Sequence, residues 1–246
     1  MKIPRWQLLF GGGLLLATGL LYGLHYYIFR DAHHIFLYLL GDIAFLPVDV
    51  LIVTLVIHNL LMKHEKRSLL QKMNMVIGSF YSEAGTELLK HLASFDGNIE
   101  NSRGKLRISA GWMKKDFEEL LGGIRRIEVC IKCSGADLSR LNKFLSSKRD
   151  FFLLLLENPN LMEHDAFTDL LWAVLHVSEE LSFRKDLEGL SDADLDHLSG
   201  DIKRAYLCLL EQWVLYMQHL KDAYPYLYSL SVRTNPFNPD SRAEIG

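Results

Sequence analysis

The chain has 246 residues, 49% of them hydrophobic, and a formal net charge of -3. Nucleic-acid recognition normally begins with a basic face, so this charge balance disfavours nucleic acid as a partner. The charge is also unevenly distributed, because only six charged side chains precede Lys63. We therefore expect an apolar part at residues 1–62 and a separately folded domain at residues 63–234.

Two long apolar runs lie within the first part. Residues 7–29 carry no charged side chain and exceed the ~20 residues that a helix needs to cross a bilayer. A second run follows at residues 35–62. We predict that both cross the membrane as a transmembrane helical hairpin of an integral membrane protein. The alternative is a signal peptide cleaved near Ala17-Thr18-Gly19, but the apolar run continues for about ten residues beyond that point.

Positive charges flank the two runs on the same side. Lys2 and Arg5 precede the first run, and Lys63, Lys66 and Arg67 follow the second. Cytoplasmic flanks of membrane helices carry an excess of Lys and Arg. We expect both chain termini in the cytoplasm and the hairpin in the plasma (inner) membrane.

The first run contains a pair of small residues at a spacing of four, Gly19 and Gly23. Such pairs allow the backbones of two membrane helices to approach closely, although glycine is also common in membrane helices without this role. We expect close helix packing at this pair, either against the second run or against another subunit of a homo-oligomer.

The second run contains two acidic residues, Asp42 and Asp49, and a proline between them, Pro47. Ionisable groups at membrane depth usually face protein or water. If the helix is continuous, the two carboxylates lie ~20° apart around the helix and ~10 Å apart in depth. In an oligomer this acidic stripe would form two rings of carboxylates, the arrangement that cation pores use. If the helix begins at Pro47, Asp49 is a helix-start residue near the positive end of the dipole. Residues 35–46 would then re-enter the membrane or lie on it.

The remainder of the chain has the apolar periodicity of helices and no internal repeat. Helices are predicted at about 60–95, 112–124 with a break at Gly122-Gly123, 137–157, 161–184, 191–224 and 226–233. The polar residues 101–104 read as part of a connection, and residues 127–133 alternate as an extended segment would. The tail at residues 235–246, with Pro236 and Pro239, is expected to be flexible. The predicted fold class is all-α, with a cytoplasmic antiparallel helical bundle.

One polar line stands out in this domain. Asp169, Trp172, His176 and Glu180 recur at spacings of three and four and so share one helix face. Carboxylates and imidazoles on facing helices can bind a metal, but the Glu-x-x-His pairs of di-metal bundles are absent. We interpret this line first as the polar border of an amphipathic helix and predict no metal or cofactor.

Motifs of the common enzyme classes are absent from the sequence. It contains no glycine-rich phosphate loop, nucleophile elbow or HExxH motif. Cys130 and Cys133 form a lone CxxC pair, and with Cys208 they are typical of reduced thiols in the cytosol. We therefore predict no catalytic residues and a protein that is not an enzyme.

Three stretches resemble a known family. FLPVD at residues 45–49, ENPNLMEHDAFTDLLW at 157–172 and YPYLYSLSVRTNPF at 224–237 are similar to a family of uncharacterised prokaryotic membrane proteins with two spans and a helical cytoplasmic domain. The resemblance implies the architecture and no activity. It carries over no functional residues.

The leading hypothesis is an oligomeric membrane protein that presents a cytoplasmic helical interaction or regulatory module. Its expected partners are the lipid bilayer, further copies of the chain and a cytoplasmic protein. The aromatic residues between Trp213 and Phe237 are expected mainly to seal the core of the bundle, and the alternative is that they offer a docking surface for that protein. The alternative is an oligomeric cation or proton channel lined by Asp42 and Asp49.

Overall fold

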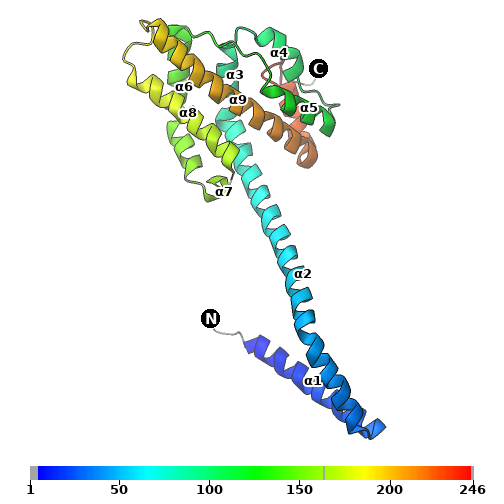
Figure 1. Ribbon diagram of the computed structural model, residues 1–246. Helices are drawn as coiled ribbons and strands as arrows, with labels where there is room; N and C mark the ends of the chain where they lie inside the picture. The colour runs from blue at the N-terminus through cyan, green and yellow to red at the C-terminus, as the bar shows by residue number, and fades with distance from the viewer. Residues whose placement is uncertain (1–4, 163, 245–246) are drawn as a thin grey trace. The chain divides into compact units, whose positions relative to one another are not determined.

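The computed structural model describes residues 5–162 and 164–244, which divide into two compact units, Met1–Lys66 and Arg67–Gly246. Lys2, part of the orientation argument, and the last two residues of the expected tail lie outside the described residues. Helices account for most of the described residues, which contain no β-strand (Figure 1). The prediction of an all-α fold is confirmed.

The first unit contains helix α1 (Arg5–Phe29) and the beginning of helix α2 (Ala32–Phe80). Only Arg30 and Asp31 separate the two helices. Arg30 adopts a left-handed conformation with φ of 56°, and the carboxylate of Asp31 accepts a hydrogen bond from the backbone N–H of His34 at 3.1 Å. The connection is shorter than predicted, because Asp31 caps α2 and His33 and His34 already belong to that helix.

Both helices of this unit present apolar side chains that the chain itself does not cover. The most apolar stretch of each helix has no buried residue, and Leu9 and Leu15 are 78% and 77% exposed. By length and composition, α1 and α2 are each able to cross a membrane. A soluble monomer rarely exposes a contiguous apolar surface of this extent.

Helix α2 continues through Pro47 without interruption. Proline has no backbone N–H, so the helix gives up one internal hydrogen bond there. The alternative in which the helix begins at Pro47 is therefore wrong for this structure. Asp49 does not lie in a first helical turn, and Asp42 and Asp49 belong to one continuous helix.

The second unit contains the end of α2 and a bundle of further helices. These are the π-helical segment η1 (Tyr81–Gly85), α3 (Thr86–Ser94), α4 (Ile99–Leu106), α5 (Lys114–Ile124), α6 (Gly135–Leu156), α7 (Pro159–Met162), α8 (Asp165–Phe183), α9 (Asp192–Ala223) and α10 (Pro225–Arg233). The long helix α9 packs against α3, α5, α8 and α10, and α8 also packs against α6 (Figure 1). Its core face is fully buried at Tyr206, Leu210 and Val214, which places α9 at the centre of the bundle.

The helix predicted over residues 60–95 contains a π-helical turn instead of uniform α-helix. At Gly85 a Cβ atom would lie 2.5 Å from Cε1 of Phe80 and 2.8 Å from Cδ1 of Tyr81. The rings of Phe80 and Tyr81 are both buried, so neither has free space to move into. Glycine at this position lets the two rings pack against the widened turn.

Two other local expectations differ from the structure, and a third agrees with it. Residues 101–104 belong to helix α4, whose inward face buries Ser102 and Leu106. Helix α5 continues through Gly122 and Gly123 to Ile124. Residues 127–133 are not helical, as expected, and make one isolated antiparallel bridge, between Asp96 and Ile131.

The first residues of the expected flexible tail are packed. Asn235 is fully buried, donates from Nδ2 to the carbonyl of Leu106 at 3.3 Å and accepts from the N–H of Phe237 at 2.8 Å. The ring of Phe237 meets that of Trp213 with centroids 5.3 Å apart. Residues 235–237 are therefore part of the core, because an aromatic ring and a polar anchor hold them there.

Candidate functional site

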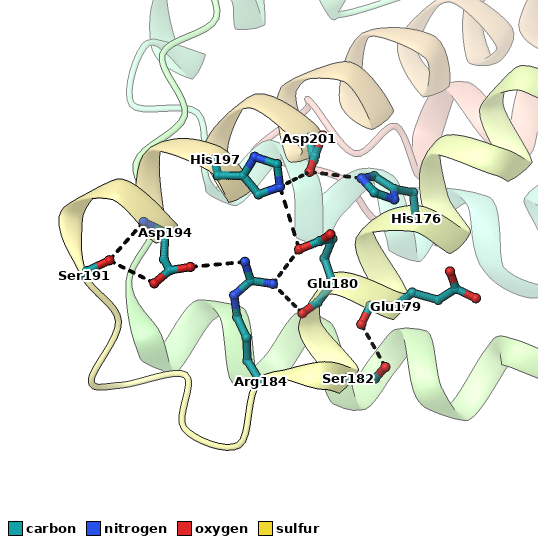
Figure 2. A network of polar contacts seen from close by, with 9 residues as sticks. All are labelled: His176, Glu179, Glu180, Ser182, Arg184, Ser191, Asp194, His197 and Asp201. Carbon is teal, nitrogen blue, oxygen red and sulfur yellow. Dashed lines mark hydrogen bonds and ion pairs between the residues drawn. The ribbon is translucent and has the colours of Figure 1, made fainter.

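A polar network joins the end of α8 to the beginning of α9 (Figure 2). Helix α9 begins after Ser191, whose hydroxyl oxygen accepts the N–H of Asp194 at 3.2 Å and whose O–H donates to the carboxylate of Asp194 at 2.9 Å. A serine cap followed three residues later by an acid is a common helix-start motif. It fixes the Asp194 carboxylate at the edge of the network.

Arg184 connects the two helices. Its Nη1 atom donates to Oε2 and to the backbone carbonyl oxygen of Glu180, each at 2.6 Å, and its Nη2 atom donates to Oδ1 of Asp194 at 3.2 Å. The guanidinium thus satisfies two carboxylates and the carbonyl of Glu180 near the end of α8. This contact links the carboxyl end of α8 to the first turn of α9.

Asp201 lies at the buried end of the network between two histidines. Its Oδ2 atom is 3.3 Å from Nε2 of His176 on α8 and 3.4 Å from Nε2 of His197 on α9. Its side chain is only 6% exposed, whereas the two histidine side chains are about half exposed. Figure 2 shows the two rings approaching this carboxylate from either side.

The two oxygens of Asp201 differ in their surroundings. Oδ1 lies 3.3 Å from Nη1 of Arg204, while Oδ2 has no partner in hydrogen-bonding geometry among the described residues. His197 Nε2 also lies 3.7 Å from Oε2 of Glu180 and so completes the link to the Arg184 contacts. A buried carboxylate beside imidazoles can orient those rings and exchange a proton with them.

The charges in the network are nearly balanced. Hydrogen bonding from Arg184 lowers the pKa of Glu180, and the Ser191 hydroxyl together with Arg184 lowers the pKa of Asp194. The hydrogen bonds to Glu180 and Asp194 in turn raise the pKa of Arg184. Three carboxylates, those of Glu180, Asp194 and Asp201, thus face the guanidinium groups of Arg184 and Arg204.

The network is not arranged as a metal centre. Among the described residues, no group of three or more His, Cys, Asp and Glu side chains is arranged so that it could hold a metal ion. The histidines contact the same oxygen of Asp201, and Arg184 occupies the Glu180 carboxylate. The contacts between α8, Arg184 and α9 favour a polar clamp between two helices.

Two residues of the predicted polar line belong to this network, and two do not. His176 and Glu180 are members. Asp169 is exposed and makes no ion pair among the described residues, and Trp172 is 61% exposed. They lie nearer the beginning of α8, further from the loop that leads from α8 to α9.

Sequence reasoning missed Arg184, Asp194, His197 and Asp201, which complete the network. Two signals were present, since Arg184 follows Glu180 by four residues and Asp201 follows His197 by four. A spacing of four places two side chains on one helix face, as for His197 and Asp201 on α9, whereas Arg184 directly follows the end of α8 and its side chain returns to Glu180. The two pairs lie next to each other because α8 packs against α9, which the sequence does not show.

The candidate residues in the first unit are all exposed in the single chain. Asp42 and Asp49 lie on the surface of α2. Around Gly19 and Gly23 no atom lies within 4 Å of where a Cβ would be, leaving out the backbone of the helix itself. The packing role of these glycines and the ion-path role of the acids stay predictions.

The cysteines are free thiols. Cys130 is exposed, and Sγ of Cys133 lies 3.3 Å from Oγ of Ser199. Burial raises the pKa of Cys133 and of Cys208. Thiols with a raised pKa are weak nucleophiles at neutral pH, so Cys133 and Cys208 are not activated as nucleophiles.

The fold and the network define an all-helical protein in which two apolar helices precede a helical domain, two of whose helices are joined by a polar network. The chain belongs to the MJ1433 family: residues 1–61 match the domain described as "MJ1433, N-terminal helical domain", and residues 69–233 match "Uncharacterized protein MJ1433, C-terminal helical domain". A relative, "Uncharacterized protein MJ1433" of Methanocaldococcus jannaschii, is 42% identical over 241 residues, covering 98% of this chain and 97% of that protein. No solved structure matches the chain. The predicted membership of an uncharacterised family is confirmed.

Proposed function

We propose that this chain is an integral plasma-membrane protein that oligomerises and presents a cytoplasmic helical interaction or regulatory module. The observation that carries the proposal is the uncovered apolar surface of α1 and of the first part of α2. Burial of apolar surface is worth about 25 cal/mol per Å², so side chains such as Leu9 and Leu15 favour lipid or protein strongly over water. Two spans would leave both termini on one side of the membrane.

The continuity of α2 supports the link between membrane and module. One helix carries the second apolar run and then supplies Met73, Ile77 and Phe80 to the core of the second unit. Because α2 belongs to both parts, its movement would act on both, and this supports a role in passing a signal between them. The proposed role is non-enzymatic and requires no metal or cofactor.

Membrane insertion and topology are tested together. The untagged chain should sediment with membranes, resist carbonate extraction and dissolve in detergent. For topology, the three native cysteines are changed to serine, and Asp31→Cys is compared with Ser146→Cys, an exposed position in the second unit. In intact cells an impermeant maleimide should label position 31 but reach position 146 only after the membrane is opened. Recovery in the soluble fraction, or cytosolic access to position 31, would overturn the proposal.

The oligomeric state has its own test. Detergent-solubilised protein measured by mass photometry should exceed the monomer mass, and Gly19→Leu with Gly23→Leu should reduce the larger species. The control is Gly12→Leu, which adds the same bulk to α1 outside the small-residue pair. A strict monomer at all concentrations would contradict the oligomer.

The second candidate function is an oligomeric cation or proton channel. It is favoured by the passage of α2 through Pro47, since one continuous helix carries Asp42 and Asp49 seven residues apart, ~20° apart around the helix axis. Rings of such carboxylates attract cations. Liposome flux assays with Asp42→Asn and Asp49→Asn test it. Absence of flux in the parent protein, or flux that neither change alters, would remove this candidate.

A further inference from the structure

A cavity of about 420 Å³ lies within the second unit between the end of α2, the start of η1, α9 and α10. Its volume falls in the range of small-molecule sites. It lies outside the polar network described above. Asn74, Gly78 and Glu83 line one side, and Tyr216, His219 and Tyr224 line the other.

The aromatic wall of the cavity is held in place. Tyr216 stacks on the buried ring of Tyr81, with centroids 4.6 Å apart and planes 14° apart, and the Tyr81 hydroxyl donates to the carbonyl of Leu209 at 3.2 Å. Tyr224 meets His219 edge to face at 5.7 Å. Burial raises the pKa of Tyr216, so its phenol stays neutral at physiological pH.

The histidine in the wall contributes no positive charge at neutral pH. Nδ1 of His219 lies 3.2 Å from Nδ2 of Asn74, and an amide nitrogen is a donor only, so Nδ1 accepts this hydrogen bond. Neutral His219 therefore carries its proton on Nε2. Burial lowers the pKa of His219, opposed only in part by Asp222.

Glu83 is the one acidic side chain among the described residues that line the cavity, and no Lys or Arg is among them. It is exposed at the cavity and forms no ion pair within the described part of the chain. The rest of the lining is neutral and consists of Met75, Ser79, Ser82, Leu220 and Leu227. Aromatic rings beside a carboxylate are the surroundings that favour an organic cation, through charge pairing and cation–π attraction.

We propose that this cavity binds a small organic cation, an amine or quaternary ammonium compound, paired with Glu83 and covered by Tyr216 and Tyr224. The larger cavity of about 680 Å³, between α4 and α5, does not favour a cation over an anion. Two basic residues, Lys105 and Arg126, line it together with two acidic ones, Asp116 and Glu119. The inference does not depend on membrane insertion or on oligomerisation.

The test uses the full chain in detergent micelles and isothermal titration with choline. The matched probe is 3,3-dimethyl-1-butanol, which has the shape of choline without its charge. Choline should bind saturably, and the neutral probe should bind at least tenfold more weakly. Absence of saturable choline binding, or equal binding of the two probes, would overturn the proposal.

Two variants and their controls locate the site. Glu83→Gln should weaken choline binding about tenfold or more, whereas Glu87→Gln, an exposed acid one turn later that does not line the cavity, should leave it unchanged. Gly78→Leu should fill the cavity and abolish binding, while Gly78→Ala should fold normally, because its Cβ meets only Tyr216, at 3.9 Å. If Gly78→Leu fails to fold, the Glu83 and Glu87 pair decides. Equal weakening by Glu83→Gln and Glu87→Gln would contradict the assignment.

Discussion

The Oδ2 atom of Asp201 lies 3.4 Å from Nε2 of His197, one turn earlier on the same helix. The same oxygen lies 3.3 Å from Nε2 of His176 on the neighbouring helix. A single buried carboxylate therefore acts both within α9 and across to α8. The network draws its partners from these two helices and from both ends of the eight-residue loop that connects them, 184–191.

We expect Asp201→Asn to lower the free energy of unfolding by about 1–3 kcal/mol, because the amide loses the charge that holds Arg204 and the imidazoles. Thermal and urea unfolding of the full chain in detergent, followed by circular dichroism, measures this. Asp196→Asn is the control, since Asp196 is exposed on the same helix. An unchanged or increased stability for Asp201→Asn would show that the carboxylate does not clamp the helices.

The contact between Arg184 and Glu180 predicts a loss of stability in acid. Hydrogen bonding from Arg184 lowers the folded-state pKa of Glu180, so this group stabilises the fold above its unfolded pKa of about 4.3. That contribution is lost as the pH falls from about 5 through the lowered folded pKa. Unfolding measured between pH 3 and 7 should show this decline.

Replacing Arg184 tests the origin of that decline. Arg184→Gln should flatten the pH dependence below pH 5 and reduce stability at pH 7 by about 0.5–1 kcal/mol, the scale of a partly exposed pair. Arg149→Gln is the matched control, because Arg149 pairs with Glu179 at the surface, 3.4 Å away. If both variants flatten the curve equally, the decline comes from general charge effects and not from this contact.

Phe237 is predicted to be essential to the second unit. Its ring is 1% exposed and packs on Trp213, so Phe237→Ala should cost about 3–5 kcal/mol of stability. Phe183→Ala is the control, since Phe183 is 84% exposed and its removal should change stability by about 0.5 kcal/mol or less. Similar melting temperatures for Phe237→Ala and the parent would mean that the tail is loose after all.

Gly85 should not accept a side chain. Gly85→Ala places a methyl group against the buried ring of Phe80 and should destabilise the chain by about 1–3 kcal/mol. Gly104→Ala, in helix α4 with no atom within 4 Å of its Cβ position, should instead be neutral or stabilise by about 0.5–1 kcal/mol. Differential scanning calorimetry distinguishes the two, and a stable Gly85→Ala variant would show that the π-helical turn can relax.

Helix positions were largely predictable because their signals are local. Helix α9 was predicted at 191–224 and runs from Asp192 to Ala223, with Ser191 as its cap and Pro225 after its end. Helix α4 was missed because its polar composition carries little apolar periodicity. Only Ser102 and Leu106 are buried in it, and their burial depends on neighbours distant in sequence.

The polar network likewise contains some contacts that the sequence predicts and others that only the packing of the helices decides. The pair of His197 with Asp201 follows from a spacing of four on one helix, which the sequence shows directly. The pair of Glu180 with Arg184 has the same spacing, but Arg184 directly follows the end of α8. The pairing of His176 with Asp201, and of Arg184 with Asp194, arises where α8 packs against α9. Periodicity specifies which residues share a helix face. The pairing of helix faces is decided by burial of the whole core. That burial depends on contacts between residues far apart in the chain, which periodicity does not specify.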